Sequence, residues 1–430
     1  MQSRTFLRNE AIALLSRLAQ VRPFSASMPM VWAATVSDEA MGAIEQHLTK
    51  VKVGLRAAVM EFAQSLSAAE NAGEPPDVLQ GRFVLLKLRF NNLLDQLDIF
   101  ADVLAQRSEH GTGVWMAGLD AVAEDALQVA QGKEALPPLI CFLDRGHGAA
   151  IRRARTRLPG GDLNPVAVIQ VPRERMVGSG IAPSLIHEVG HQGASLLDLV
   201  ETMRISIQKA SQKNLPQAAA WQLYERWISE IVADCWAMGH LGVGASLGLI
   251  GVMSLPRYFV FRISTDGPHP FPWIRVKISL AYGALLFPDA QWARFEALWE
   301  QLYPRRGLSD EQQLVLSQLE NTLPNLVRLI AGHRSEKLGK GPFASRFPLA
   351  ARQPVQLRAL AELWGETPEK YFSQAPSLAF AVAGQARADG RIAPQAESRL
   401  IAQCLEHWAK TTREPGKRSM RPPVRAFLHD

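Results

Sequence analysis

The chain of 430 residues contains little cysteine and no long unbroken hydrophobic run. Its cysteines are Cys141, Cys235 and Cys404. Three cysteines are too few for a disulfide framework or a four-sulfur zinc site, so a reducing compartment is favoured. The most apolar window, Leu241 to Leu255, contains several glycines and ends at Pro256. It is too short to span a bilayer and predicts a buried core helix instead.

Targeting signals are also weak. The apolar stretch that begins at Ala11 is broken by Arg17, and no small-residue cleavage site follows it. We therefore expect no secretory signal. A cytoplasmic location is favoured over an organellar or a membrane-peripheral one.

Most of the net charge of +6 lies near the end of the chain. Between Lys410 and Arg425 there are six basic residues and one acidic residue, Glu414. The rest of the chain is therefore close to neutral, so we expect no nucleic-acid partner. The proline and arginine content predicts a solvated basic tail, and an arm that binds nucleic acid or an acidic partner is the alternative. A hydrophobic content of 47% and a charged content of 20% are typical of a globular protein and exclude wholesale disorder.

Apolar residues recur at spacings of three and four in several segments, which predicts helices. These segments are about 38–70, 77–106, 115–129, 181–211 and 216–239. The Gly- and Pro-containing connection at 71–76 makes the first two an antiparallel hairpin. Two β-rich runs, Leu139–Leu143 and Pro165–Val171, predict a small sheet. The second run is either an edge strand that aligns an extended peptide or an ordinary buried strand.

A metal-binding pattern lies in the fourth predicted helix, at His187-Glu-Val-Gly-His191. Histidines four residues apart project from one face of a helix and can hold one metal ion. Two neutral imidazoles suit zinc. Glu188 is rotated by about 100° from His187, where it can take a proton from a metal-bound water. Gly190 keeps the helix slim where another helix must pack.

Two carboxylates follow on the next predicted helix, Glu230 and Asp234. They are also four residues apart, so one can complete the ligand set while the other hydrogen-bonds a ligand histidine. A solvated acidic face is the alternative. The apolar neighbours Trp227 and Ile231 argue against it, because buried carboxylates need partners such as a metal.

The succession of His187-Glu-x-x-His191 and Glu230-x-x-Ala-Asp234 resembles the gluzincin metallopeptidases. Asp266-Gly-Pro-His269-Pro270, with Arg275 six residues after the histidine, is similar to the His-Pro…Arg element of the prenyl-protein and heat-shock membrane endopeptidases. The resemblance covers about 178–276. It implies the following roles: zinc ligands His187, His191 and Glu230; base Glu188; ligand-orienting residue Asp234; oxyanion-facing group His269 or Arg275.

His269 and Arg275 each have a purely structural alternative to the oxyanion-facing role. His269 can be a turn histidine held between two prolines, and Arg275 can pair with Asp266 or Asp234. The resembled endopeptidases are usually embedded in a membrane, whereas no segment of this sequence convincingly spans one. Their location and substrates are therefore not implied for this chain.

The predicted fold class is α+β, mostly helical, and the resemblance implies a zincin-like core with a small sheet. The predicted divisions are a helical hairpin region at 1–135, a metallopeptidase domain at 136–342, a small helical domain at 343–412 and the basic tail at 413–430. A short phrase, Ala-Asp389-Gly390-x-Ile392 followed by Glu397, resembles TerB-like helical domains. The only histidines before 136 are His47 and His110, so the N-terminal helices are expected to gate or recruit.

The resemblance implies a zinc-dependent endopeptidase that acts on a peptide or protein substrate. The alternative is a non-catalytic helical scaffold with a structural or vestigial zinc site. Glu188 favours the enzyme, because a purely structural site does not need a residue that binds no metal. A zinc hydrolase of non-peptide amides is a third possibility.

Overall fold

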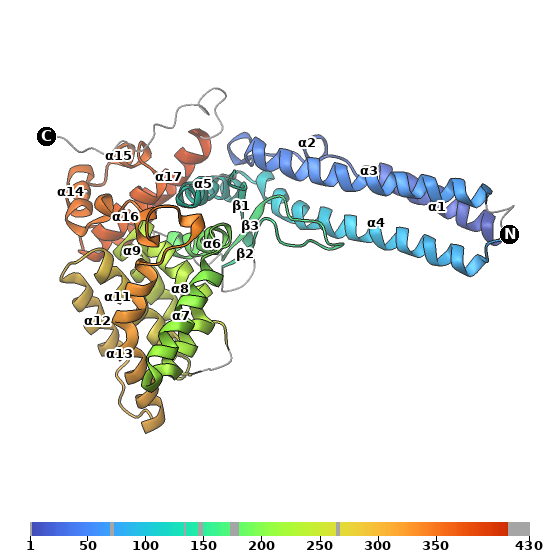
Figure 1. Cartoon of the computed structure of the whole chain (residues 1–430). Helices are drawn as coiled ribbons and strands as arrows, with labels where there is room; N and C mark the ends of the chain where they lie inside the picture. Colours follow the sequence, from blue (N-terminus) through green and yellow to red (C-terminus); the bar gives the residue numbers. More distant parts are fainter. Residues whose placement is uncertain are drawn as a thin grey trace. The chain divides into compact units, whose positions relative to one another are not determined.

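The computed structural model describes residues 2–68, 73–132, 135–144, 149–172, 180–263 and 267–411. These residues are mostly helical and include one three-stranded sheet (Figure 1), which confirms the coarse fold class. The chain forms two compact units. The first unit comprises Met1–Met116, Pro137–Phe142 and Arg152–Val168. The second unit comprises Ala117–Leu136, Leu143–Ile151 and Ile169–Asp430.

The first unit is built on a long antiparallel helical hairpin, α3 and α4 (Figure 1). Its helical segments are α1 (Ser3–Ala19), α2 (Phe24–Ser27), η1 (Trp32–Ala34), α3 (Asp38–Ala68), α4 (Pro76–Ala105) and η2 (Gln106–Ser108). The Phe62 and Phe83 rings stack across the hairpin with centroids 5.9 Å apart. The predicted hairpin is therefore confirmed, although its connection at 71–76 begins outside the described residues.

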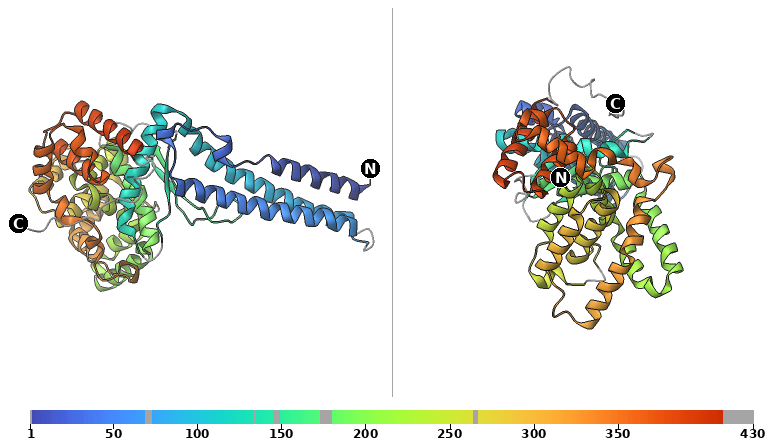
Figure 2. Two further views of the ribbon diagram at one scale, coloured as in Figure 1. Left: turned by 90° about the horizontal axis from the view of Figure 1, so that it is seen from above. Right: turned by 90° about the vertical axis from the view of Figure 1, so that its left-hand side faces the viewer.

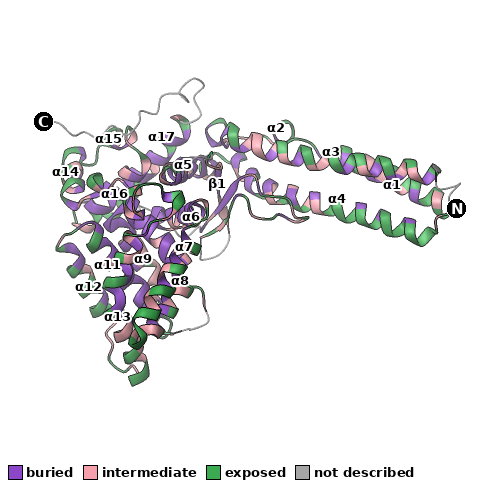
Figure 3. Ribbon diagram, viewed as in Figure 1, coloured by how far each residue is buried: buried purple, intermediate pink, exposed green. Residues whose placement is uncertain are grey.

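Helix α1 lies along the hairpin (Figure 2) and completes a three-helix arrangement. Its apolar residues at spacings of three and four are buried: Leu7, Ala11, Leu14 and Leu18. They join the same hydrophobic core as the inward residues of α3 and α4, whose alternation with exposed residues is visible in Figure 3. The apolar stretch near the start of the chain is thus part of a folded unit.

The sheet has the strand order β1-β3-β2. Its strands are β1 (Leu139–Asp144), β2 (Ala150–Arg152) and β3 (Ala167–Pro172). Both predicted β-rich runs form strands. Of the two alternatives for the second run, the buried strand is confirmed and the edge strand is excluded, because β3 has a neighbour on each side. Its nearly continuous buried apolar run is typical of a central strand, whereas the outer strand β2 has only three residues.

The second unit is almost entirely helical. Its segments are α5 (His110–Leu127, from Ala117 onward), η3 (Gln128–Ala130), α6 (Ile181–Leu196), α7 (Leu199–Lys213), η6 (Leu215–Gln217), α8 (Ala218–Leu241), α9 (Val243–Met253), α10 (Arg257–Val260), α11 (Pro272–Leu286), α12 (Gln291–Leu302), α13 (Asp310–Ala331), η7 (Glu336–Leu338), η8 (Phe343–Arg346), η9 (Leu349–Arg352), α14 (Pro354–Trp364), α15 (Pro368–Phe372), α16 (Pro376–Ala388) and α17 (Pro394–Thr411). The predicted basic tail at 413–430 lies outside the described residues. Within the described ranges, no helix has both the length and the apolar character of a bilayer span.

The helix predicted over about 181–211 is interrupted, so the prediction of one continuous helix is wrong. Helix α6 ends at Leu196 and α7 begins at Leu199. Between them Asp198 adopts φ 50°, in the left-handed region. Aspartate tolerates this conformation better than most residues do. The apolar face continues across the break, with Met203 and Ile207 buried, which is why periodicity alone suggested one helix.

Two glycines allow α6 and α8 to approach closely. A Cβ atom added at Gly190 would lie 2.9 Å from the Cα atom of Ala233 and 2.8 Å from the Cβ atom of Trp236. One added at Gly193 would lie closer than 3.0 Å to three atoms of the Trp236 indole. Real Cβ contacts essentially never occur at such distances. The close helix packing predicted at Gly190 is therefore confirmed, and it occurs on α6, the helix that carries His187 and His191.

We expect Gly193→Ala to lower the free energy of unfolding by about 1–3 kcal/mol, the usual cost of overpacking. The Trp236 indole cannot easily move aside, because it is buried and its Nε1–H donates a 3.0 Å hydrogen bond to the Ala126 carbonyl oxygen. Denaturant unfolding measures the change. Gly251→Ala is the control, because a Cβ there meets nothing within 4 Å. Equal stability of the two variants would contradict the close packing.

Candidate metal centre

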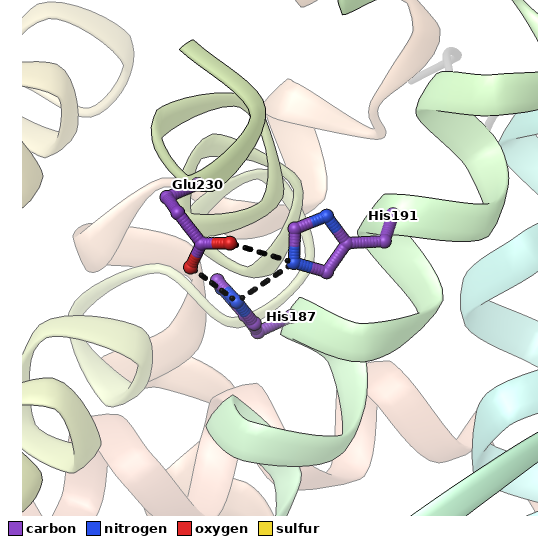
Figure 4. A group of neighbouring side chains, drawn as sticks. All are labelled: His187, His191 and Glu230. Atoms are coloured by element: carbon purple, nitrogen blue, oxygen red, sulfur yellow. Dashed lines mark hydrogen bonds and ion pairs between the residues drawn. The ribbon is translucent and has the colours of Figure 1, made fainter. Parts of the chain in front are cut away.

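Two helices bring the predicted metal ligands together (Figure 4). His187 and His191 project from α6, and Glu230 projects from α8 toward both rings. The two Nε2 atoms lie 3.2 Å apart. Glu230 Oε2 lies 3.3 Å from His187 Nε2, and Glu230 Oε1 lies 3.3 Å from His191 Nε2. Two imidazole nitrogens and one carboxylate therefore converge, with ligand atoms of the three residues within 4.8 Å of one another.

This convergence follows from the spacing on α6 and from the antiparallel course of α8. A spacing of four residues places both imidazoles on one side of α6. The end of α8 nearer Asp234 lies beside His187, and the end nearer Ser229 lies beside His191. Within the described ranges, His187, His191 and Glu230 form the one group of histidine, cysteine or acidic side chains that could hold a metal ion.

Asp234 and Arg275 hold the first histidine. His187 Nδ1 lies 2.7 Å from Asp234 Oδ1. The Arg275 guanidinium donates from Nε to Asp234 Oδ2 at 2.7 Å and from Nη2 to Asp234 Oδ1 at 2.9 Å. The predicted alternative pairing of Arg275 with Asp234 is therefore confirmed, whereas Asp266 lies outside the described residues. Arg275 also approaches Glu230 Oε2 at 3.4 Å, so it faces both carboxylates.

Ser229 contacts the second histidine, a role that sequence reasoning missed. Its Oγ atom lies 3.3 Å from His191 Nδ1. The residue directly precedes Glu230 on α8, and serine next to a ligand is too common to stand out in a sequence. The antiparallel pairing of α6 with α8 is the information that singles it out.

Charges in the site control the protonation of His187. Burial by itself lowers the pKa of His187, but the Asp234 carboxylate, through its charge and its hydrogen bond, helps to raise that pKa to about 9. Burial acts to raise the pKa of Asp234, yet the charges of Arg275 and His187 lower it to about 2. Without a metal, protonated His187 and Arg275 together balance the negative charges of Asp234 and Glu230.

The remaining two glutamates differ in their acidity. Burial favours the neutral form of Glu230, but hydrogen bonds to His187 and His191 outweigh burial and lower the pKa of Glu230. Glu188 is only 7% exposed, and burial raises the pKa of its carboxyl group, opposed by the charges of His187 and His191. Glu230 is thus an anion suited to a cation, whereas Glu188 has the raised proton affinity of a base.

His269 lies at the exposed side of the centre. Its side chain is 60% exposed, and its Nε2 atom lies 3.4 Å from Glu230 Oε2. It precedes α11, which carries Arg275. The structure therefore brings both His269 and Arg275 beside Glu230, with His269 exposed and Arg275 buried.

Comparisons with known proteins identify no relative. No protein-family model, curated protein or solved structure matches this chain. The functional interpretation therefore depends on the geometry and charges of the site, together with the motif order in the sequence.

Proposed function

We propose that the protein is a zinc-dependent endopeptidase. The observation that carries the proposal is that the two imidazole Nε2 atoms lie 3.2 Å apart and that each lies 3.3 Å from one oxygen of the Glu230 carboxylate. Tetrahedral zinc with bonds of about 2.0–2.1 Å keeps neighbouring ligand atoms about 3.3 Å apart. Two imidazoles and one carboxylate are a ligand set of catalytic zinc sites, which leave one position for water or substrate. The order of motifs along the chain, which resembles gluzincin peptidases, supports the same proposal.

Glu188 is the proposed general base. A bound zinc supplies Lewis acidity, which polarises a carbonyl group and makes a water easier to deprotonate. Glu188 takes the proton from the attacking water and passes it to the leaving amine. Its raised pKa suits this work, because an ordinary glutamate is too weak a base to hold a proton near neutral pH.

Asp234 and Arg275 act as positioning residues in this proposal. Asp234 accepts a hydrogen bond from His187 Nδ1–H, which leaves Nε2 free to bind the metal. Arg275 balances the charge of Asp234 and restrains Glu230. Because its guanidinium is buried and already engaged by both carboxylates, we assign the oxyanion-facing role to His269.

His269→Ala is expected to lower kcat by roughly 10²–10³, with little change in KM or zinc content. A donor at the exposed side of the zinc ligands would stabilise negative charge that develops only in the transition state. Steady-state kinetics and metal analysis of the same preparation measure the effect. His110→Ala, which removes an exposed histidine from α5, is the control. A normal kcat would make His269 a turn histidine, and loss of zinc would make it a ligand.

A digest of a quenched peptide library tests the proposed function. Protein loaded with one equivalent of zinc should cleave internal peptide bonds, a chelator should abolish cleavage, and added zinc should restore it. Stoichiometric zinc without cleavage would favour the scaffold alternative. Turnover of small amide substrates without peptide cleavage would favour a non-peptide hydrolase.

We also infer a cytoplasmic location and a peptide or protein substrate, with no nucleic-acid partner. The three cysteines are buried and form no disulfide with one another, which supports a reducing compartment. Probing the free thiols of protein isolated from its native cells tests the compartment. Oxidised cysteines in that sample would contradict it.

A further inference from the structure

We propose that Ser229 is the positioning residue of His191, and that its hydroxyl selects the tautomer in which His191 Nε2 can bind the metal. The inference rests on the metal-binding part of the proposed function and not on peptide hydrolysis. Ser229 would touch neither substrate nor metal and would act through His191.

The argument begins with the two ring nitrogens of His191. Its Nε2 atom faces the ligand group, 3.2 Å from His187 Nε2 and 3.3 Å from Glu230 Oε1. Its Nδ1 atom lies on the other side of the ring, 3.3 Å from Ser229 Oγ. A neutral imidazole carries one proton, so Nε2 offers a lone pair to a metal only when Nδ1 carries that proton. The Nδ1–H group then donates to Ser229 Oγ.

The two histidines therefore have parallel supports on the same helix. His187 Nδ1 pairs with Asp234, and His191 Nδ1 pairs with Ser229, five residues earlier on α8. The supports differ in charge: a carboxylate backed by Arg275 holds one ring, and a neutral hydroxyl holds the other. A single hydroxyl is thus the contact that selects the tautomer of His191.

Loss of such a supporting contact typically lowers metal affinity by about 10–100-fold. We expect this loss for Ser229→Ala, because the Nδ1 proton then has no acceptor at that position. Ser229→Thr keeps a hydroxyl at the same branch point and should retain most of the affinity. Ser246→Ala is the matched control, because it removes a buried hydroxyl that bonds Ser279 at 2.8 Å instead of a histidine.

The experiment is a competition titration of the full-length variants with zinc and a chromophoric chelator. Thermal melting of each metal-free variant is measured alongside, because a role confined to folding would change the metal-free midpoint rather than the zinc affinity. A second readout is the ¹⁵N spectrum of the histidine rings in the zinc-loaded protein. We expect a protonated Nδ1 on His191 in the wild type.

Several outcomes would overturn the inference: wild-type affinity in Ser229→Ala, an equal loss in Ser229→Thr and Ser229→Ala at unchanged metal-free stability, or a proton on His191 Nε2 in the zinc-loaded wild type. Failure of the proposed function is distinguishable from these. A wild type that binds zinc tightly but cleaves no peptide would contradict the endopeptidase and leave the role of Ser229 intact. A wild type that binds no zinc would contradict both.

Discussion

Glu188→Gln should reduce peptide hydrolysis by roughly 10²–10⁴-fold, the usual contribution of a general base. Glutamine keeps the shape of the side chain but cannot accept and return a proton. Because the carboxyl group of Glu188 is buried and is not one of the three converging ligands, zinc content and fold should be unchanged. The measurement is kcat for a peptide substrate, with elemental analysis of the same sample.

Glu201→Gln on α7 is the matched control, since this side chain is largely exposed and pairs with Arg204. It should behave as the wild type. Unchanged turnover in Glu188→Gln would refute the proposed mechanism. Loss of zinc from that variant would instead make Glu188 a structural residue of the centre.

His187→Ala and Glu230→Ala should each lose stoichiometric zinc and, with it, all zinc-dependent cleavage. Each substitution removes one of the three residues that, within the described part of the chain, form the ligand group. Among the described residues, Glu230→Ala also leaves Asp234 as the remaining carboxylate that pairs with Arg275. Elemental analysis after dialysis against a weak chelator measures the effect.

Asp198→Asn serves as the control for these variants, because it changes a carboxylate at the α6–α7 break that takes no part in the ligand group, while asparagine also tolerates the left-handed backbone. Full zinc occupancy in both ligand variants would place the metal elsewhere. Loss in only one of them would show that the other residue is not a ligand.

Much of the fold and the site can be predicted from local patterns. The spacing of Leu55, Val59 and Phe62 predicts the first helix of the α3–α4 hairpin, because a helix places residues three and four apart on one face. The same spacing predicts a shared metal for His187 and His191. Helix α1 follows the rule as well, because Arg17 interrupts its apolar stretch without breaking the spacing of its buried residues.

Contacts between distant segments could not be predicted in this way. Periodicity does not reveal the order of strands, so the central position of β3 became clear only from pairing with β1 and β2. Apolar periodicity also continues unchanged across the break at Asp198, because the apolar residues on both sides face the same core. The end of α6 and the start of α7 therefore could not be predicted from it.

In the metal centre, too, local spacing could be predicted from the sequence, whereas contacts between helices could not. A helical spacing of four is a local property. It therefore predicts that His187 and His191 share one face of α6, and Glu230 and Asp234 one face of α8, whichever helix packs against them. Which partner each group meets depends on the register of α6 against α8 and on the approach of α11. The packing of α6 on α8, made possible by Gly190 and Gly193, brings Ser229 to His191, and the approach of α11 engages Arg275 with Asp234. Tertiary structure alone decides these contacts, because they join residues whose separation along the chain carries no periodic signal.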